Sequence, residues 1–508
     1  MIQQIDFFAI SPPLVLALAA GLVLLLDAFL PARPRTRSGL GLVTLAGVLT
    51  SLGFVVAQAL RGGAPQSTFC VPPALAGGQA QSAAMCSFVV DGFTLVFAGM
   101  VLAAGVVVVL MSMTELAGGA IPVGEWYFLL LCTLVGAVTL PASRDLIMLV
   151  VALELVSLPV FALTALKRYD GRASEAAVKL FVVSVVSTAI MLFGVSLLYG
   201  IAGSVHLSRL GEVFSGRQAP TVAGAELPAV VTVGVVLVAA GFAFKIAAVP
   251  FHSWAADVYQ GAPVPVAALL SVVSKAAGFA GLILVLVTGL AGQAATWAPI
   301  VGILAALTMT AGNLLALRQR SAVRLLAWSS VAQSGYVLAP LAVAAIARGA
   351  VGASMAYLVI YAAMNLGAFA VVMLVSRTAA RNELDDYRGL ALRRPAAGVT
   401  LAFCLVCLAG LPPGLAGLFA KVFVFRELVG GGAGWLAVVM AVNTVIGLYY
   451  YAVWTGRLFA PVGGEASPAT YRPPVTAWLA VGVALAAAVL FSIAPQLVLD
   501  MTALSAFG

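Results

Sequence analysis

Apolar runs of about 20 residues recur along the whole sequence, and only short loops separate them. A transmembrane α-helix needs about 20 consecutive apolar residues to cross the hydrocarbon core of a bilayer. Only 9% of the residues are charged, whereas a soluble protein carries roughly 25%. The alternating ten-residue pattern of an outer-membrane barrel is absent. The sequence therefore predicts an all-α polytopic membrane protein, and it predicts a single transmembrane domain over residues 1–508 because no soluble-like insert interrupts the runs.

The apolar runs define about fourteen expected transmembrane helices. Their ranges are 9–31, 38–60, 88–113, 124–142, 145–166, 174–202, 228–250, 261–289, 296–317, 323–346, 351–377, 397–429, 434–460 and 475–500.

Basic residues predict the orientation of these helices. The basic loops at 33–37, 167–172, 318–324 and 377–394 follow the first, fifth, ninth and eleventh helices, so all four lie on one side of the membrane. Cytoplasmic loops carry an excess of lysine and arginine. We therefore expect a multi-pass protein of the cell membrane with both termini outside. The net charge of +8 then reflects topology, and no nucleic-acid partner is expected.

The five cysteines indicate no metal centre. Cys132, Cys404 and Cys407 lie inside apolar runs, where a free cysteine behaves as a small apolar residue. The Cys404–Cys407 spacing has no second cysteine pair and no histidine near it. Cys70 and Cys86 flank a loop on the expected outer side, and a disulfide between them is possible if that side is oxidising.

Proline interrupts the seventh and the twelfth expected helices. Pro250 lies in the stretch AAVPFHSW, and Pro412 and Pro413 lie in LAGLPPGLAGLFAK. Proline removes a backbone hydrogen bond that lipid does not replace, so a broken helix at membrane depth faces protein or water. Such breaks mark ion and substrate sites in transporters. A mirror-like arrangement of 124–289 and 296–460 around the two breaks would be an inverted repeat.

Lysine is rare and is placed unusually. Of the 26 lysine and arginine residues only five are lysines, and three of these, Lys245, Lys275 and Lys421, lie deep in apolar helices. Arginine keeps its proton, whereas a buried lysine can release it. Lys179, near the start of the helix 174–202, is placed where its side chain can reach the interface.

Glu154 lies in the middle of the helix 145–166, where an unpaired carboxylate is costly. We expect Glu154 to form an ion pair with Lys245. Opening this pair would favour the neutral form of the lysine and so release a proton. Buried charges that fix helix packing are the structural alternative. Four ionisable residues on different helices favour a proton relay across the membrane instead. His252, Tyr336 and Ser330 are candidate supporting residues, although interface anchoring and helix packing explain them as well.

Motifs of soluble catalytic sites are absent from the sequence. It contains no phosphate-binding loop, no glycine-rich dinucleotide fingerprint and no set of cysteines spaced for an iron–sulfur cluster. We therefore expect no cofactor and no metal in this chain.

Five segments carry a resemblance to a known family. They are LELVSLPVFALTALKR, RASEAAVKLFVVSVVSTAIMLFGVSLLYGIAGS, FKIAAVPFHSWAADVYQGAPVPVAALLSVVSKAAGF, GNLLALRQRSAVRLLAWSSVAQSGYVL and LAGLPPGLAGLFAKVFVF. Together they resemble the antiporter-like subunits of bacterial respiratory complex I, the proton-translocating NADH:quinone oxidoreductase. The SEAAVKLF stretch, the chain length and Lys421 favour subunit N among them.

The resemblance implies fourteen helices with two inverted five-helix repeats, at 124–289 and 296–460, flanked by 1–113 and 475–508. It implies one proton channel in a membrane subunit of an oxidoreductase translocase. NADH, flavin, iron–sulfur clusters and quinone would then belong to partner subunits. The expected neighbours are the antiporter-like subunit M, small membrane subunits and the lipid of a bacterial plasma membrane.

The resemblance also implies residue roles. Lys245 would be the switching lysine paired with Glu154, Lys275 would link the half-channels, and Lys421 would exchange protons with the outside. Relatives often carry histidine where this chain has Gln333, which cannot titrate, so water or Tyr336 would have to substitute.

Three other functions remain open at the level of sequence. The runner-up is a subunit of a multi-subunit cation/proton antiporter, which shares the fold. A membrane subunit of an energy-converting hydrogenase and a scaffold that transports nothing are the others. The scaffold alone predicts that the deep lysines can be replaced without effect.

Overall fold

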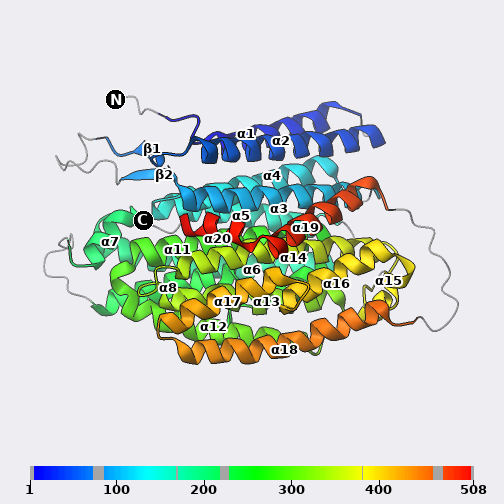
Figure 1. The fold of residues 1–508 in the computed structure, drawn as a ribbon. Coiled ribbons are helices and arrows are strands. Elements are labelled where there is room, and N and C mark those ends of the chain that lie inside the picture. Colours follow the sequence, from blue (N-terminus) through cyan, green and yellow to red (C-terminus); the bar gives the residue numbers. More distant parts are fainter. Residues whose placement is uncertain are drawn as a thin grey trace.

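The computed structural model describes residues 5–31, 33–72, 85–119, 121–167, 170–217, 228–379, 381–461 and 473–504. Long helices run side by side through most of these residues (Figure 1). The all-helical polytopic architecture expected from the apolar runs is confirmed. Residues 73–84 of the loop between Cys70 and Cys86, and the first and last four residues, lie outside the described ranges.

The first half of the bundle follows the expected ranges closely. Its long helices are α1 (Ser11–Phe29), α2 (Pro34–Arg61), α3 (Gly92–Leu116), α4 (Val123–Thr139), α5 (Leu146–Ala165), α6 (Gly171–Ala202) and α8 (Pro228–Lys245). The next expected helix, 261–289, consists of α10 (Val264–Leu269), a π-helical segment at Leu270–Ser274, α11 (Lys275–Ile283) and a second π-helical segment at Leu284–Gly289.

The second half of the bundle contains the remaining long helices. They are α12 (Ala294–Ala316), α13 (Ala322–Leu338), α14 (Ala350–Ser376), α16 (Pro395–Ala409), α17 (Leu415–Gly430), α18 (Gly434–Phe459), α19 (Val475–Ile493) and α20 (Pro495–Leu504). Shorter helices are α9 (Trp254–Gly261) and α15 (Leu390–Arg393).

Both proline interruptions are present. Helix α8 ends at Lys245, five residues before Pro250, and α9 begins at Trp254. Helix α16 ends at Ala409, and α17 begins at Leu415 beyond the two prolines. The expected helix 228–250 is therefore too long at its carboxyl end, because the chain leaves the helix before it reaches the proline.

Small elements on the connecting segments were not expected, among them a pair of strands and a short amphipathic helix. Strands β1 (Gln66–Cys70) and β2 (Cys86–Val90) pair antiparallel, so residues 88–90 are strand and not the start of the helix 88–113. The amphipathic helix α7 (Leu207–Phe214) follows α6. A disulfide joins Cys70 to Cys86, as the sequence allowed.

Eleven helices within the described ranges are long and apolar enough to cross a membrane by length and composition, and two shorter apolar helices, Ala229–Lys245 and Pro395–Ala409, accompany them. The expected total of fourteen spans and the two inverted repeats stay predictions.

Helix α14 lies at the centre of the bundle, and 94% of its apolar 18-residue window is buried. It packs against α13, α16, α17 and α19, and a helix covered on all sides is apolar all round. Helices α1 and α2, coloured blue, form one edge of the bundle, and α18 lies at the opposite edge (Figure 1).

The two ends of the bundle differ in chemistry. The connection between α1 and α2 and the short helix α15 lie at one end, on the right in Figure 1. We call this the basic end, because it gathers the basic loops that follow α1, α5, α12 and α14. The β1–β2 pair and α7 lie at the other end (Figure 1), which we call the hairpin end.

Candidate functional site

Lys245 is the last residue of α8 and is 6% exposed. Its ammonium nitrogen Nζ donates hydrogen bonds to the hydroxyl groups of Ser157 on α5 and of Ser184 on α6, the latter at 3.0 Å. The break after α8 therefore places the end of this helix among hydroxyl groups from two neighbouring helices. A buried ammonium group that makes two hydrogen bonds in this way avoids part of its desolvation cost.

Glu154 lies one helical turn before Ser157 on α5. Its Oε1 accepts a hydrogen bond of 2.6 Å from the Thr188 hydroxyl, and Thr188 lies one turn after Ser184 on α6. Glu154 and Thr188 thus lie one turn away from Ser157 and Ser184, the residues of α5 and α6 that bind Lys245. The direct Glu154–Lys245 ion pair expected from the sequence is not formed in this conformation, because hydroxyl groups take its place on both sides.

Lys275 is the most deeply buried of the candidate lysines, at 1% exposure. It begins α11 directly after the π-helical segment Leu270–Ser274, and π-helical turns are frequent at functional sites. Its Nζ donates to the Ser330 carbonyl oxygen at 2.5 Å and to the Ser334 hydroxyl at 2.8 Å. The Ser330 hydroxyl in turn accepts a hydrogen bond of 2.8 Å from Tyr361 on α14.

Gly278 brings the helix of Lys275 against Lys245. A Cβ atom at Gly278 would lie 3.1 Å from the Cβ of Lys245 and 3.0 Å from a methyl group of Ile246. Gly278 is three residues after Lys275 and so lies on the same side of α11. The first two lysines therefore come from helices that pack in direct contact.

Lys421 binds the end of a broken helix. Its Nζ donates to the carbonyl oxygens of Leu408 at 3.2 Å and Ala409 at 2.7 Å. These are the last residues of α16, so their carbonyl groups have no partner in the next helical turn. A cation at the carboxyl end of a helix is also favoured by the helix dipole. The break before α17 thus creates the site that holds the third buried ammonium group.

Gln333 connects Lys421 to the centre of the bundle. Its Nε2 donates to the same Leu408 carbonyl at 3.5 Å and to the Tyr451 hydroxyl at 3.2 Å, and its Oε1 accepts from Tyr357 at 2.6 Å. Gln333 lies on α13 next to Ser334, which binds Lys275. One face of α13 therefore carries polar contacts to both Lys275 and Lys421.

The four supporting candidates have different surroundings. Ser330 contacts Lys275, as described above, and the ring of Tyr336 lies 5.4 Å from the Lys421 Nζ. The His252 ring packs edge-on against Trp328, with the ring centroids 5.5 Å apart. Lys179 lies away from the buried lysines, at the basic end, in ion pairs with Glu175 and Asp257.

Asp257 joins three helices at the basic end. It accepts from Lys179 of α6 at 3.1 Å and from Arg324 of α13 at 2.8 Å. Burial raises the pKa of the Asp257 carboxyl, but the hydrogen bonds and positive charges of Arg324 and Lys179 outweigh this, so its pKa lies below the ordinary value. This ion-pair network keeps its charge at neutral pH.

Five hydroxyl-bearing residues around these sites were not identified from the sequence. They are Ser157 and Ser184, which bind Lys245, Thr188, which binds Glu154, Tyr361, which binds Ser330, and Tyr357, which binds Gln333. A signal was present, because Ser184 and Thr188 are four residues apart, as are Tyr357 and Tyr361, and so share a helix face. Polar residues are common at helix contacts in membranes, so this spacing alone does not select them.

Gly410 supports the Lys421 site, and its replacement by alanine is a test of that geometry. Its φ of +82° ends α16, and a Cβ atom there would lie 3.2 Å from the Nζ of Lys421. We expect Gly410→Ala to destabilise the protein by about 1–2 kcal/mol and to lower its thermal unfolding midpoint. Gly430→Ala, which meets no atom within 4 Å, is the control. Equal midpoints for the two variants would contradict the steric role of Gly410.

No group of three or more histidine, cysteine, aspartate or glutamate side chains within the described ranges is arranged to hold a metal ion.

Comparison with known proteins gives concordant matches. The family model described as "NADH:quinone oxidoreductase/Mrp antiporter, TM" matches residues 143–447. NADH-quinone oxidoreductase subunit N 2 of Streptomyces griseus is 48% identical over 526 aligned positions, covering 100% of this chain and 95% of the relative. Subunit N of Salinispora tropica is 43% identical over 469 positions, covering 90% and 86%.

Solved structures agree with these matches. A chain in the structure of respiratory complex I from Thermus thermophilus with bound aureothin is 30% identical, with a TM-score of 0.75 and coverage of 98% of this chain and 100% of that chain. A chain of the Mrp complex from Dietzia sp. has a TM-score of 0.79 at 20% identity, with 97% of each chain covered. The second likeness shows the fold alone.

Proposed function

Because the chain belongs to the subunit N family of NADH-quinone oxidoreductases, we propose that it is a proton-translocating subunit in the membrane arm of such a complex. Electron transfer from NADH to quinone takes place in partner subunits, and this chain carries protons across the membrane. Its ionisable residues Glu154, Lys245, Lys275 and Lys421 form the proton pathway.

The carrying observation is that α13 contacts the sites of two buried lysines, while the third, Lys245, lies on a helix packed against that of Lys275. Lys421 and Gln333 share the Leu408 carbonyl, and Ser330 and Ser334 of α13 bind Lys275. The helix of Lys275 packs against Lys245. Lysine residues at this depth are costly, and a line of three, each held by groups that can exchange hydrogen bonds, supports proton transfer more strongly than helix packing.

The ion pair between Glu154 and Lys245 could control the protonation of Lys245, because its energy is comparable with that of the membrane potential. Moving the Lys245 ammonium from the serine hydroxyls toward Glu154 would form the ion pair, which at ~4 Å and an effective dielectric constant of ~20 gains about 4 kcal/mol before desolvation. Moving one charge against 100 mV costs about 2.3 kcal/mol. The interaction energy of the pair therefore exceeds the cost of moving one charge against 100 mV. Forming or breaking the pair can thus decide whether Lys245 holds its proton against the membrane potential.

The redox chemistry of the complex belongs to partner subunits. NADH, flavin, iron–sulfur clusters and quinone belong to other subunits, and no redox centre is expected here. Subunit M and small membrane subunits are the proposed neighbours in a bacterial plasma membrane. The basic end faces the cytoplasm and both termini face outside, in keeping with the positive-inside rule and with the Cys70–Cys86 disulfide at the hairpin end.

A cation/proton antiporter subunit is the alternative within the same fold. The likeness to the Mrp complex favours it only through the fold, whereas full-length identity of 48% favours the quinone oxidoreductase. Copurification with a complex that oxidises NADH supports our proposal. Sodium-dependent proton flux without a redox partner would instead support the antiporter.

Replacement of Lys245 by alanine tests the proposed pathway. We expect Lys245→Ala to lower NADH-driven proton uptake into inverted membrane vesicles by about a hundredfold, the loss typical of a missing proton-transfer group. NADH oxidation coupled to quinone should fall with it. Arg457→Ala, at an exposed ion pair with Asp385, is the control, and a native gel checks assembly. Unchanged proton uptake in an assembled Lys245→Ala complex would leave the scaffold as the better explanation.

A further inference from the structure

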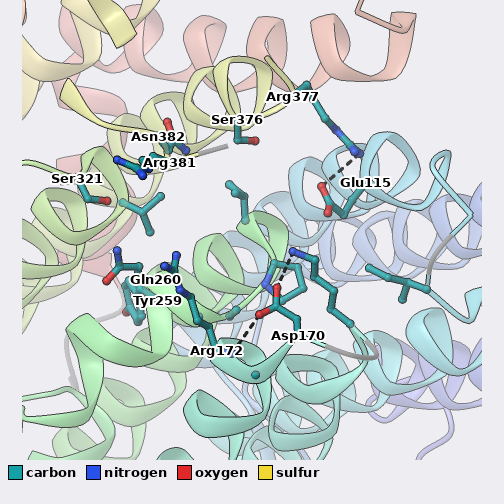
Figure 2. A pocket seen from close by; sticks show the side chains of 18 of the residues that line it. Glu115, Asp170, Arg172, Tyr259, Gln260, Ser321, Ser376, Arg377, Arg381 and Asn382 are labelled. Carbon is teal, nitrogen blue, oxygen red and sulfur yellow. Dashed lines mark hydrogen bonds and ion pairs between the residues drawn. The ribbon is translucent and has the colours of Figure 1, made fainter. Parts of the chain in front are cut away.

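A polar cavity of about 880 Å³ opens at the basic end of the bundle. Figure 2 shows charged and amide side chains around it, among them Glu115, Arg172, Arg377 and Arg381. They come from α3, α6 and the segment that follows α14. The cavity is wide and hydrophilic enough to be filled with water, so it can bring protons to the residues that form its inner wall.

Tyr259 of α9 belongs to the wall of this cavity, yet it is only 1% exposed. Its ring packs edge-on against Trp254 on one side and Phe369 on the other. Its hydroxyl group is buried and makes no hydrogen bond of good geometry in the part of the chain that the structure describes, although the Ser330 hydroxyl lies beside it. A buried hydroxyl that is poorly hydrogen-bonded is costly, so the position calls for an explanation beyond packing.

The Tyr259 hydroxyl faces the group that holds Lys275. It lies beside the Ser330 hydroxyl and close to the Tyr361 hydroxyl. Tyr361 donates to the Ser330 hydroxyl at 2.8 Å, and the Ser330 carbonyl accepts from the Lys275 Nζ. Tyr259 therefore stands between the cavity at the basic end and the most deeply buried lysine.

We propose that Tyr259 is a relay residue, through which protons pass between the cavity at the basic end and the Ser330–Tyr361–Lys275 group. This inference rests on the function proposed above and adds the route by which protons reach Lys275. A phenol hydroxyl both donates and accepts hydrogen bonds. It can accept a proton from the cavity side as its own proton passes to the Ser330 hydroxyl, which in turn gives its proton to the neutral amine of Lys275, so both hydroxyl groups stay neutral and Lys275 gains the charge. The relay requires only a small rotation of the hydroxyl between the cavity side and Ser330.

The test compares Tyr259→Phe with two other variants. Phenylalanine keeps the ring and its contacts with Trp254 and Phe369 but removes the hydroxyl group. Tyr127→Phe on α4 is the matched control, because Tyr127 is equally buried and lies outside the relay. Lys275→Ala tests the pathway itself. All three are assayed for NADH-driven proton uptake in inverted vesicles, with assembly checked on a native gel and NADH oxidation measured with an artificial acceptor.

We expect Tyr259→Phe to lower proton uptake by about tenfold or more, with the artificial-acceptor rate unchanged and Tyr127→Phe like the wild type. If Lys275→Ala abolishes proton uptake but Tyr259→Phe matches the wild type, the relay is overturned and the proposed function stands. If Lys275→Ala itself pumps normally, the proposed function fails. If Tyr259→Phe and Tyr127→Phe lower uptake equally, the effect is one of packing, and the relay is again overturned.

Discussion

Replacement of Lys275 by arginine is expected to stop proton transport even though the positive charge is kept. The guanidinium group does not release its proton under accessible conditions, whereas a buried ammonium group does. Lys275 is 1% exposed, and its Nζ contacts the Ser330 carbonyl and the Ser334 hydroxyl. We expect NADH-driven proton uptake to fall by about a hundredfold or more, measured in inverted vesicles.

The control for this experiment is Lys179→Arg. Lys179 forms ion pairs with Glu175 and Asp257 at the exposed basic end, where arginine can replace the charge. It should retain wild-type proton uptake. Because arginine is larger than lysine, Lys275→Met serves as a second variant of similar length without the charge, and the native gel shows which variants assemble. Normal pumping by an assembled Lys275→Arg complex would show that Lys275 is needed only as a charge.

Replacement of Lys421 by methionine is expected to remove both proton transport and part of the stability. The Ala409 carbonyl loses the ammonium group that it binds at 2.7 Å, and the Leu408 carbonyl keeps only its long contact with Gln333. An unsatisfied buried acceptor costs about 1–3 kcal/mol. We therefore expect a lower thermal unfolding midpoint of the purified complex, together with proton uptake reduced to background.

Arg457→Met is the control for Lys421→Met, since Arg457 pairs with Asp385 at a partly exposed site. It should change neither quantity. A Lys421→Met complex with normal stability but no proton uptake would separate the two roles and leave only proton exchange. Normal proton uptake in this variant would contradict the assignment of Lys421 to the pathway.

The sequence predicted most helices well because membrane helices are set by local composition. A stretch of apolar residues of the right length forms a helix wherever it crosses the bilayer, since the backbone has no other way to satisfy its hydrogen bonds. The two breaks were predicted for the same reason, because proline acts on its own helix. The β1–β2 pair and α7 were missed, since they lie on connecting segments where this constraint does not apply.

The sequence also identified the buried lysines, but not what holds them. Lys245, Lys275 and Lys421 stand out because charge is rare in apolar helices. Their partners come from helices far away along the chain, such as Ser157 for Lys245 and Ser330 for Lys275. The direct Glu154–Lys245 pair was a reasonable expectation from charge alone, but the rotation of α5 and α6 presents hydroxyl groups to the ammonium instead.

The sequence by itself determined that this chain is a helical membrane protein with three lysines at membrane depth and two broken helices. Each of these properties depends on residues that are neighbours along the chain. Only the tertiary structure decided that α13 lies between Lys275 and Lys421, that α11 packs against Lys245, and that Tyr259 separates a polar cavity from Lys275. These contacts depend on how distant helices rotate and pack against one another, which no local pattern specifies.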